Sequence, residues 1–380
     1  MKRVVVLGST GSVGTQTLDV LARLGKSFSV AGLAAGHWSD GFATQLARWD
    51  PEYAAVGADG AAREAGSEVA LFTGPGALEL LVQAVVPDIL VLATPGLVGL
   101  SACLAVLRDG GIVALANKEP MVAAGHLVTA TAREHRGAIV PVDSEHNGVW
   151  QCLRGEERES IVQIILTSSG GAFRDTPLDQ LSYATVEDAL RHPTWSMGPK
   201  ITVDSATLMN KGLEIIEASW LFDVPPSAIS IVLHRQSIVH ALVEFVDGSI
   251  KAQLAVPDMR LPILNALMYP ERVGADLPKL DVQNLGSLTF EPIDDNRYPS
   301  IPLARSAAEA GGAYPTVLNA ANEVAVDRFL AGEIRFTSIV PLVQETVDRH
   351  NDRIGAGTIA EIEAADSWAR AVCRTLNVNE

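Results

Sequence analysis

The first 25 residues contain the pattern that most constrains the fold of this chain. A β-branched run at residues 3–7 is followed by the glycine-rich turn GSTGSVG (8–14) and then by TQTLDVLARL, with leucines at helical spacing. This order predicts a strand, a turn and a helix, in which free N–H groups at the helix start can bind a pyrophosphate. The spacing is GxxGxxG instead of GxGxxG, so a turn that binds nothing is the alternative. We expect a nucleotide, because an alternating β/α segment follows.

Four later runs of apolar residues predict more strands of the same sheet, at 28–33, 89–93, 112–115 and 138–142. Ala/Leu-rich helical segments separate them, which indicates an α/β fold with a Rossmann-like, doubly wound parallel sheet. The second strand ends in LAAGHW, without the carboxylate that binds the ribose hydroxyls of NAD, so NADP is expected. His37 is a candidate neighbour of the extra phosphate, or only a solvated loop residue.

The totals restrict the class of protein. A chain of 380 residues with 48% hydrophobic residues can form two or three domains. A net charge of −16 argues against nucleic acid or an anionic membrane as a partner, and no apolar span of membrane length is found. The three cysteines show no paired or metal-type spacing, and the N-terminal residues do not resemble a signal peptide. We therefore expect a cytoplasmic protein with reduced thiols and a small-molecule partner.

Two carboxylates follow the last strand of the first sheet. Asp143 and Glu145 stand two residues apart, and in an extended chain their side chains point to the same side. Such a pair suits a divalent cation such as Mg²⁺ or Mn²⁺. The alternative is that Asp143 or Ser144 caps a helix that begins near Glu145.

A second polar group occurs in DSATLMNKGLEIIEASW (204–220). Read as one helix, this segment places Trp220 on an apolar face, and on the opposite face Asn210, Lys211 and Glu214, which could hold a phosphate and supply a third metal ligand. A solvated face with a Lys211–Glu214 ion pair is the alternative. Upstream, a strand at 161–167 leads into the turn SSGG (168–171), whose hydroxyls and N–H groups also suit phosphate.

The stretch HPTWSMG (192–198) places large apolar side chains in a segment with loop composition. We interpret it as a lid bounded by Pro193 and Gly198, in which Trp195 and Met197 cover bound ligands and exclude water. A surface loop anchored in a core by Trp195 is the alternative.

These motifs, with NKE (117–119), PDMRLPI (257–263) and YPTVLNAANEVAV (314–326), occur in an order that resembles the 1-deoxy-D-xylulose 5-phosphate reductoisomerase family over almost the whole chain. The resemblance implies NADPH and Mg²⁺, Mn²⁺ or Co²⁺ as cofactors, a homodimer, and conversion of the sugar phosphate to 2-C-methyl-D-erythritol 4-phosphate in isoprenoid precursor synthesis. A divalent ion on the ketone and hydroxyl oxygens agrees with such a rearrangement.

The resemblance also implies roles for individual residues. It places the metal on Asp143, Glu145 and Glu214, and catalysis on Lys118, Glu145 and His192. The substrate residues that it implies are Ser144, Glu145, Ser169, His192, Trp195, Ser205, Asn210, Lys211, Glu214 and Met259. The cofactor residues are Thr10, Gly11, Ser12, Val13, Gly36, His37, Ala93, Asn117, Lys118, Glu119, Met197 and Gly198. The chain departs from the family pattern at Pro120, at Ser168 and at GHW (36–38).

The expected organisation has four parts. Residues 1–142 form the NADPH domain, 143–269 an α+β catalytic, metal-binding and dimerisation domain, 270–299 a linker and 300–380 a C-terminal helical bundle. Two other functions remain open: an NADP-linked dehydrogenase that needs no metal, and an NADP-binding sensor without activity.

Overall fold

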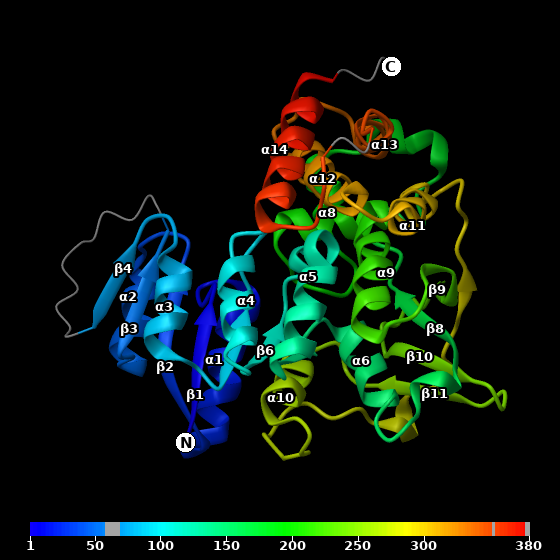
Figure 1. The fold of residues 1–380 in the computed structure, drawn as a ribbon. Helices are drawn as coiled ribbons and strands as arrows, with labels where there is room; N and C mark the ends of the chain where they lie inside the picture. Colours follow the sequence, from blue (N-terminus) through cyan, green and yellow to red (C-terminus); the bar gives the residue numbers. More distant parts are fainter. Residues whose placement is uncertain (58–68, 352–353, 377–380) are drawn as a thin grey trace. The chain divides into compact units, whose positions relative to one another are not determined.

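A computed structural model describes residues 1–57, 69–351 and 354–376 of the chain (Figure 1). Contacts divide the chain into two compact units. Unit 1 comprises Met1–Pro120, Val128–Trp150 and Asp258–Pro278, and unit 2 comprises Met121–Leu127, Gln151–Pro257 and Lys279–Glu380. The domain boundaries expected after residues 142, 269 and 299 stay a prediction.

A seven-stranded parallel sheet forms the centre of unit 1, in the order β4-β3-β2-β1-β5-β6-β7. Its strands are β1 (Lys2–Leu7), β2 (Phe28–Ala35), β3 (Tyr53–Val56), β4 (Ala70–Thr73), β5 (Ile89–Leu92), β6 (Ile112–Leu115) and β7 (Ala138–Pro141). The apolar runs of β1 and β5 are fully buried, as expected for strands covered on both faces. The prediction of a doubly wound sheet is confirmed, and β3 and β4 are additional strands.

The helices that accompany this sheet are α1 (Ser12–Leu24), α2 (Asp40–Trp49), α3 (Ala77–Val85), α4 (Leu100–Arg108), α5 (Glu119–His135), α6 (Ser144–Cys152) and α10 (Arg260–Met268). Residues Met121–Leu127 of α5 and the last two residues of α6 belong to unit 2. Helix α10 packs Ile263 and Leu267 into the same core as Val4 and Val91. Sequence far from the N-terminal third therefore completes the core of unit 1.

Unit 2 contains a five-stranded mixed sheet in the order β11-β10-β8-β9-β12. Its strands are β8 (Ile161–Ser168), β9 (Ile229–Leu233), β10 (Val239–Phe245), β11 (Ile250–Leu254) and β12 (Glu291–Pro292). Strand β8 pairs antiparallel with β10 and parallel with β9. Strand β12 pairs with β9 and lies inside the segment that the sequence predicts to be a linker.

The helices of unit 2 are α7 (Val186–Ala189), α8 (Pro199–Thr207), α9 (Met209–Phe222), α11 (Ser300–Ala310), α12 (Tyr314–Leu330), α13 (Ile339–Asp348) and α14 (Ile359–Thr375). In Figure 1 the orange and red helices α11–α14 gather together, and α12 packs against both α13 and α14. The expected C-terminal helical bundle is confirmed. Among the described residues, no helix is both long and apolar enough to span a membrane. All three cysteines are free and buried.

The prediction of one helix over residues 204–220 is wrong in two respects. The segment is broken between α8 and α9 at Leu208, whose φ of 55° is left-handed. Helix α9 is also buried on nearly all sides, because α11 packs closely against it: a Cβ on Gly212 would lie 2.6 Å from the Cβ of Ala304. Asn210 and its polar neighbours are therefore buried, whereas Trp220, predicted to face the core, is 38% exposed.

Candidate active site

The glycine turn between β1 and α1 is built so tightly that two of its positions require glycine. Gly8 has φ +82°, and a Cβ there would lie 2.3 Å from the carbonyl oxygen of Ala93 at the end of β5. A Cβ on Gly14 would lie 2.2 Å from the carbonyl oxygen of Gly8. Helix α1 begins after Gly11 without a side-chain cap. Thr10, Gly11 and Ser12 are exposed and Val13 is half-buried, so this helix start is available to a phosphate.

The ends of neighbouring strands lie beside this turn. Gly8 and Ser9 donate backbone hydrogen bonds of 2.9 and 2.8 Å to the carbonyl oxygen of Ala34, which joins the turn to the end of β2. Gly36 and His37 follow directly and are exposed. Unit 1 thus brings together the cofactor residues predicted after β1, β2 and β5.

Asn117 connects the segment after β6 to the segment after β5. Its side-chain amide donates to the carbonyl oxygen of Gly96 at 2.8 Å and to the carboxylate of Glu119 at 3.1 Å. Pro120, where the chain departs from the family pattern, occupies the first turn of α5. Its missing N–H group costs nothing there.

The two carboxylates after β7 lie at the start of α6. The sequence interpretation assumed an extended chain at these two residues, and this is wrong. The helix begins at Ser144, and the N–H of Asn147 donates to the carbonyl oxygen of Asp143 at 2.8 Å. A carboxylate oxygen of Asp143 nevertheless lies within 4.8 Å of one of Glu145. Lys118 Nζ lies 2.8 Å from Asp143 Oδ2, and the Ser144 hydroxyl donates to Glu145 Oε2 at 2.5 Å.

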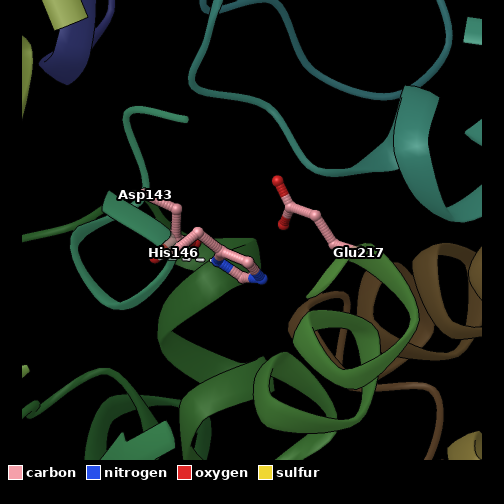
Figure 2. A group of neighbouring side chains, drawn as sticks. All are labelled: Asp143, His146 and Glu217. Carbon is pink, nitrogen blue, oxygen red and sulfur yellow. Dashed lines mark ion pairs between the residues drawn. The ribbon is translucent and has the colours of Figure 1, made fainter. Parts of the chain in front are cut away.

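Figure 2 shows the side chains of Asp143 and His146 at the start of α6, with the contact of 3.8 Å between His146 Nδ1 and Asp143 Oδ1 as a dashed line. It also draws Glu217, a buried carboxylate of α9. Neither His146 nor Glu217 was a predicted site residue, and His146 was visible in the sequence only as part of the DSEHN motif.

In unit 2 the turn after β8 lies directly against the end of α8. Gly170 and Gly171 both have positive φ, and a Cβ on Gly171 would lie 2.3 Å from the carbonyl oxygen of Ser205. Ser169 and Ser205, 36 positions apart in the sequence, are therefore brought together in the fold. This is the arrangement that a phosphate pocket made of hydroxyl and N–H groups requires.

The polar side chains of α9 form one buried cluster. Lys211 Nζ lies 2.7 Å from Glu214 Oε2, and the amide of Asn210 donates to Glu214 Oε1. Glu214 is fully buried, and Lys211 is 5% exposed. The ion pair named as the alternative interpretation is therefore present, but in the interior of unit 2 and not on a solvated face.

The loop of residues 192–198 is held by His192. Its Nε2 lies 3.0 Å from Ser169 Oγ, and its Nδ1 accepts hydrogen bonds from the N–H groups of Thr194 and Trp195 at 3.1 and 2.8 Å. Burial, and then the positive charges of Arg174 and Lys211, lower the pKa of His192 to about 4. The imidazole is therefore neutral near pH 7.

Four further predicted site residues are Trp195, Met197 and Gly198 of unit 2 and Met259 of unit 1. The Trp195 ring is 6.2 Å from the ring of His240, centroid to centroid, in unit 2. Met197 is half-buried, and Gly198 is exposed at the start of α8. Met259 packs partly buried against the core of unit 1.

Sequence analysis assigned no role to two residues that hold the turn after β8 and the end of α8 in unit 2. Arg174 donates to the carbonyl oxygen of Ser169 at 2.9 Å. Asp204 is buried next to Ser205, where it pairs with Lys200 at 2.8 Å and accepts a hydrogen bond of 2.8 Å from Asn322 of α12. The only signals in the sequence were that Asp204 begins the segment 204–220 and that Arg174 follows the SSGG turn, because contacts between distant segments leave no local pattern.

Family models match three parts of the chain. The 1-deoxy-D-xylulose 5-phosphate reductoisomerase model matches residues 4–125, and two models of the C-terminal domains of this enzyme match residues 139–222 and 254–372. The 1-deoxy-D-xylulose 5-phosphate reductoisomerase of Thermomicrobium roseum is 48% identical over 374 residues, which cover 98% of this chain and 97% of the relative. The chain belongs to the 1-deoxy-D-xylulose 5-phosphate reductoisomerase family.

Other members of the reductoisomerase family agree with this assignment. The protein of that name from Pelotomaculum thermopropionicum is 48% identical and covers 97% of both chains. The solved reductoisomerase of Zymomonas mobilis, in complex with NADPH, is 40% identical with a TM-score of 0.91. A second reductoisomerase structure, with NADPH, fosmidomycin and magnesium, is 36% identical with a TM-score of 0.93. Each structure covers 98% of this chain and is itself covered to 98%.

Proposed function

We propose that this protein converts 1-deoxy-D-xylulose 5-phosphate and NADPH to 2-C-methyl-D-erythritol 4-phosphate and NADP⁺, with a divalent metal ion, as a step in isoprenoid precursor synthesis. The observation that carries the proposal is the match to reductoisomerases along the entire chain, 48% identical to one relative over 98% of its length. The glycine turn, the carboxylates and the buried polar cluster of α9 supply the residue types that each part of this reaction needs.

Asp143, Glu145 and Glu214 are proposed to hold the metal ion. They are carboxylates, the ligands that Mg²⁺ and Mn²⁺ prefer. Their surroundings in the structure fit a cation, because Asp143 and Glu214 each bind a lysine ammonium at 2.8 and 2.7 Å. When bound, the ion supplies Lewis-acid polarisation of the substrate oxygens, and NADPH supplies the hydride.

The proposed NADPH site uses the glycine turn and the adjoining strand ends. Its members are Thr10, Gly11, Ser12, Val13, Gly36, His37, Ala93, Asn117, Lys118, Glu119, Met197 and Gly198. The uncapped start of α1 supports this assignment, because its N–H groups can donate to the pyrophosphate. The absence of a carboxylate in LAAGHW after β2 supports NADPH over NADH.

Substrate binding is assigned to polar and apolar residues of the chain. Ser169, Ser205, Asn210 and Lys211 bind the phosphate in this proposal, and an ammonium with hydroxyl donors matches its charge. Trp195 and Met259 provide apolar walls that exclude water. Ser144 and His192 donate hydrogen bonds to the substrate, Glu145 accepts the proton of a substrate hydroxyl, and the Lys118 ammonium stabilises negative charge on the substrate oxygens.

The experiment that tests this function follows NADPH oxidation at 340 nm with 1-deoxy-D-xylulose 5-phosphate and Mn²⁺, before and after excess chelator, beside a Glu214→Gln variant. We expect turnover that stops on chelation and falls at least 100-fold in the variant. Turnover that persists in chelator would favour a metal-independent dehydrogenase. Binding of NADPH without turnover would favour the sensor hypothesis, and either result would overturn the proposal.

A homodimer and a cytoplasmic location are also proposed. The edge strand β11 exposes Ile250 and Leu254, and exposed apolar residues on an edge strand suit pairing with a second copy. Sedimentation equilibrium should give twice the chain mass of 40.2 kDa, and a charge at Ile250 should shift it toward the monomer. The three free cysteines support a reducing compartment.

A further inference from the structure

We propose that Tyr298 and Ser300, at the start of α11, are positioning residues for phosphate recognition. Their hydroxyl groups hold the turn of residues 168–171 and the junction of α8 and α9 in the places that phosphate binding needs. The proposal rests on the proposed function, because it takes residues of this turn and this junction as phosphate ligands. All the residues that carry it belong to unit 2.

Each of the two hydroxyl groups holds one backbone carbonyl group. Tyr298 Oη donates to the carbonyl oxygen of Gly170 at 3.2 Å, and Ser300 Oγ donates to the carbonyl oxygen of Thr207 at 2.6 Å. Tyr298 is 3% exposed and Ser300 is fully buried. A buried carbonyl group that loses its donor loses free energy, because water does not replace the bond. The two bonds therefore favour one position of the turn and one position of the junction.

The two carbonyl groups lie on either side of a very close backbone contact. A Cβ on Gly171 would lie 2.3 Å from the carbonyl oxygen of Ser205. Gly170 directly precedes the first of these residues, and Thr207 follows the second by two positions. A displacement of either backbone therefore changes the separation of the Ser169 and Ser205 hydroxyl groups. A binding site keeps its affinity only while its groups stay within about 0.5 Å of their productive positions.

The break between α8 and α9 brings the ligands of the junction to the turn. In one continuous helix Ser205 and Lys211 would point about 120° apart, because successive residues differ by about 100°. The left-handed Leu208, with φ 55°, ends α8 between them. The positive charge of Lys211 lowers the pKa of His192, whose ring contacts Ser169 at 3.0 Å, so the ammonium lies near the turn. The bond from α11 holds the residue directly before this break.

The segment that carries the two donors is itself fixed. Arg297 donates to the carbonyl oxygens of Phe173 and Thr176, the latter at 2.5 Å. Further along α11, Ala304 packs so closely on α9 that a Cβ on Gly212 would lie 2.6 Å from its Cβ. The donors are therefore anchored on both sides and cannot follow a displaced turn. Arg297 lies in the part of the chain that the sequence predicts to be a linker.

Tyr298→Phe and Ser300→Ala each remove one hydroxyl group and almost no volume. The first measurement is the Kd of inorganic phosphate by titration calorimetry, in protein saturated with NADPH so that the pyrophosphate position is occupied. We expect each variant to raise this Kd by about threefold to tenfold, the effect of one hydrogen bond. The KM for 1-deoxy-D-xylulose 5-phosphate should rise by a similar factor, with a smaller change in kcat. A phosphate Kd within twofold of wild type in both variants would overturn the proposal.

Thr346→Val is the matched control for a loss of stability alone. Thr346 of α13 is also fully buried, and its hydroxyl donates to the carbonyl oxygen of Leu342 at 2.8 Å. This variant should lower the free energy of unfolding about as much as Ser300→Ala, but leave the phosphate Kd unchanged. An equal rise of the phosphate Kd in Thr346→Val would show general loosening of unit 2 and overturn the proposal.

Amide hydrogen exchange tests the two contacts without turnover. In protein free of phosphate, Ser300→Ala should exchange faster in the peptide 205–211 and Tyr298→Phe in the turn 168–171, whereas Thr346→Val should change neither. Unchanged exchange in both variants, or no binding of inorganic phosphate to the wild type, would overturn the proposal. If the wild type binds phosphate but does not turn over the sugar phosphate, the proposed function fails, and the phosphate Kd and the exchange rates still decide this proposal.

Discussion

Lys118 Nζ lies 2.8 Å from Asp143 Oδ2, and the two side chains are 7% and 13% exposed. Asp143 comes from the start of α6 and Lys118 from the start of α5, so this pair joins the ends of strands β6 and β7. A buried carboxylate without a cation is costly, and the ammonium supplies that charge in the protein itself. Lys118 therefore lowers the free-energy cost of burying Asp143, a predicted metal ligand, in the protein without a metal ion.

Replacement of Lys118 by Met should destabilise the metal-free protein. We expect a loss of about 3 kcal/mol in the free energy of unfolding, because Asp143, whose side chain is 13% exposed, loses the ammonium charge beside it. Mn²⁺ should reduce this difference, since the ion supplies the missing positive charge. Urea unfolding in chelator and in Mn²⁺ measures both effects, with the exposed Lys26→Met as control. Equal stability of the Lys118 variant and the wild type in chelator would contradict the prediction.

Gly14→Ala should damage both the fold of unit 1 and NADPH binding. The new Cβ would lie 2.2 Å from the carbonyl oxygen of Gly8 and 2.6 Å from Cα of Ser9, so the backbone must move. We expect at least tenfold weaker NADPH binding by fluorescence titration and a loss of about 2 kcal/mol or more in stability. Gly11→Ala is the matched control for stability, because its Cβ meets nothing closer than 3.3 Å. A Gly14 variant with normal stability would disprove the packing argument.

Asp204 should contribute to stability through its buried ion pair with Lys200. Asp204→Asn keeps an acceptor for Asn322 but removes the charge, and we expect a loss of about 2 kcal/mol in the free energy of unfolding. Asp223→Asn is the control, since its pair with Arg158 has the same 2.8 Å distance but lies on the surface. The control should cost less than about 0.5 kcal/mol. If Asp204→Asn and Asp223→Asn lower the free energy of unfolding by similar amounts, burial of the ion pair does not determine its contribution to stability.

The sequence predicts the sheets far better than the contacts of the site. Buried strands such as β1 and β5 are continuous apolar runs, which a local pattern identifies. Strand β4, ALFT, is only partly buried, and too short and mixed for such a pattern. The break at Leu208 carries no Gly or Pro signal, because packing and not local preference holds this leucine in the left-handed region.

Contacts between site residues of one motif could be predicted from the sequence. Contacts between residues of different motifs could not. Lys211 and Glu214 are three positions apart on a helix, so their contact follows from helical geometry. Ser169 and His192 are separated by 23 positions and meet only through the folded turn and loop. The same holds for Asp204 and Asn322, which are 118 positions apart.

Stability should depend on the protonation of His192. Its pKa is about 4 in the folded protein, against an ordinary value of 6.5, so between these values the unfolded chain binds a proton that the folded protein does not. The free energy of unfolding should therefore decrease as the pH falls from about 6.5 to 4, by less than about 1.4 kcal/mol per pH unit from this group, because the side chain is only partly buried. In His192→Asn this part of the slope should be absent.

Two variants of Arg174 test whether its charge contributes to the low pKa of His192. Burial is the larger cause, and the charge of Arg174 adds to it. Arg174→Gln should therefore raise the pKa of His192 partway toward 6.5, whereas Arg174→Lys keeps the charge and should leave the pKa low. A ¹⁵N titration of the imidazole measures the pKa in each variant. If both variants raise it equally, the position of the Ser169 backbone and not the charge of Arg174 controls the imidazole.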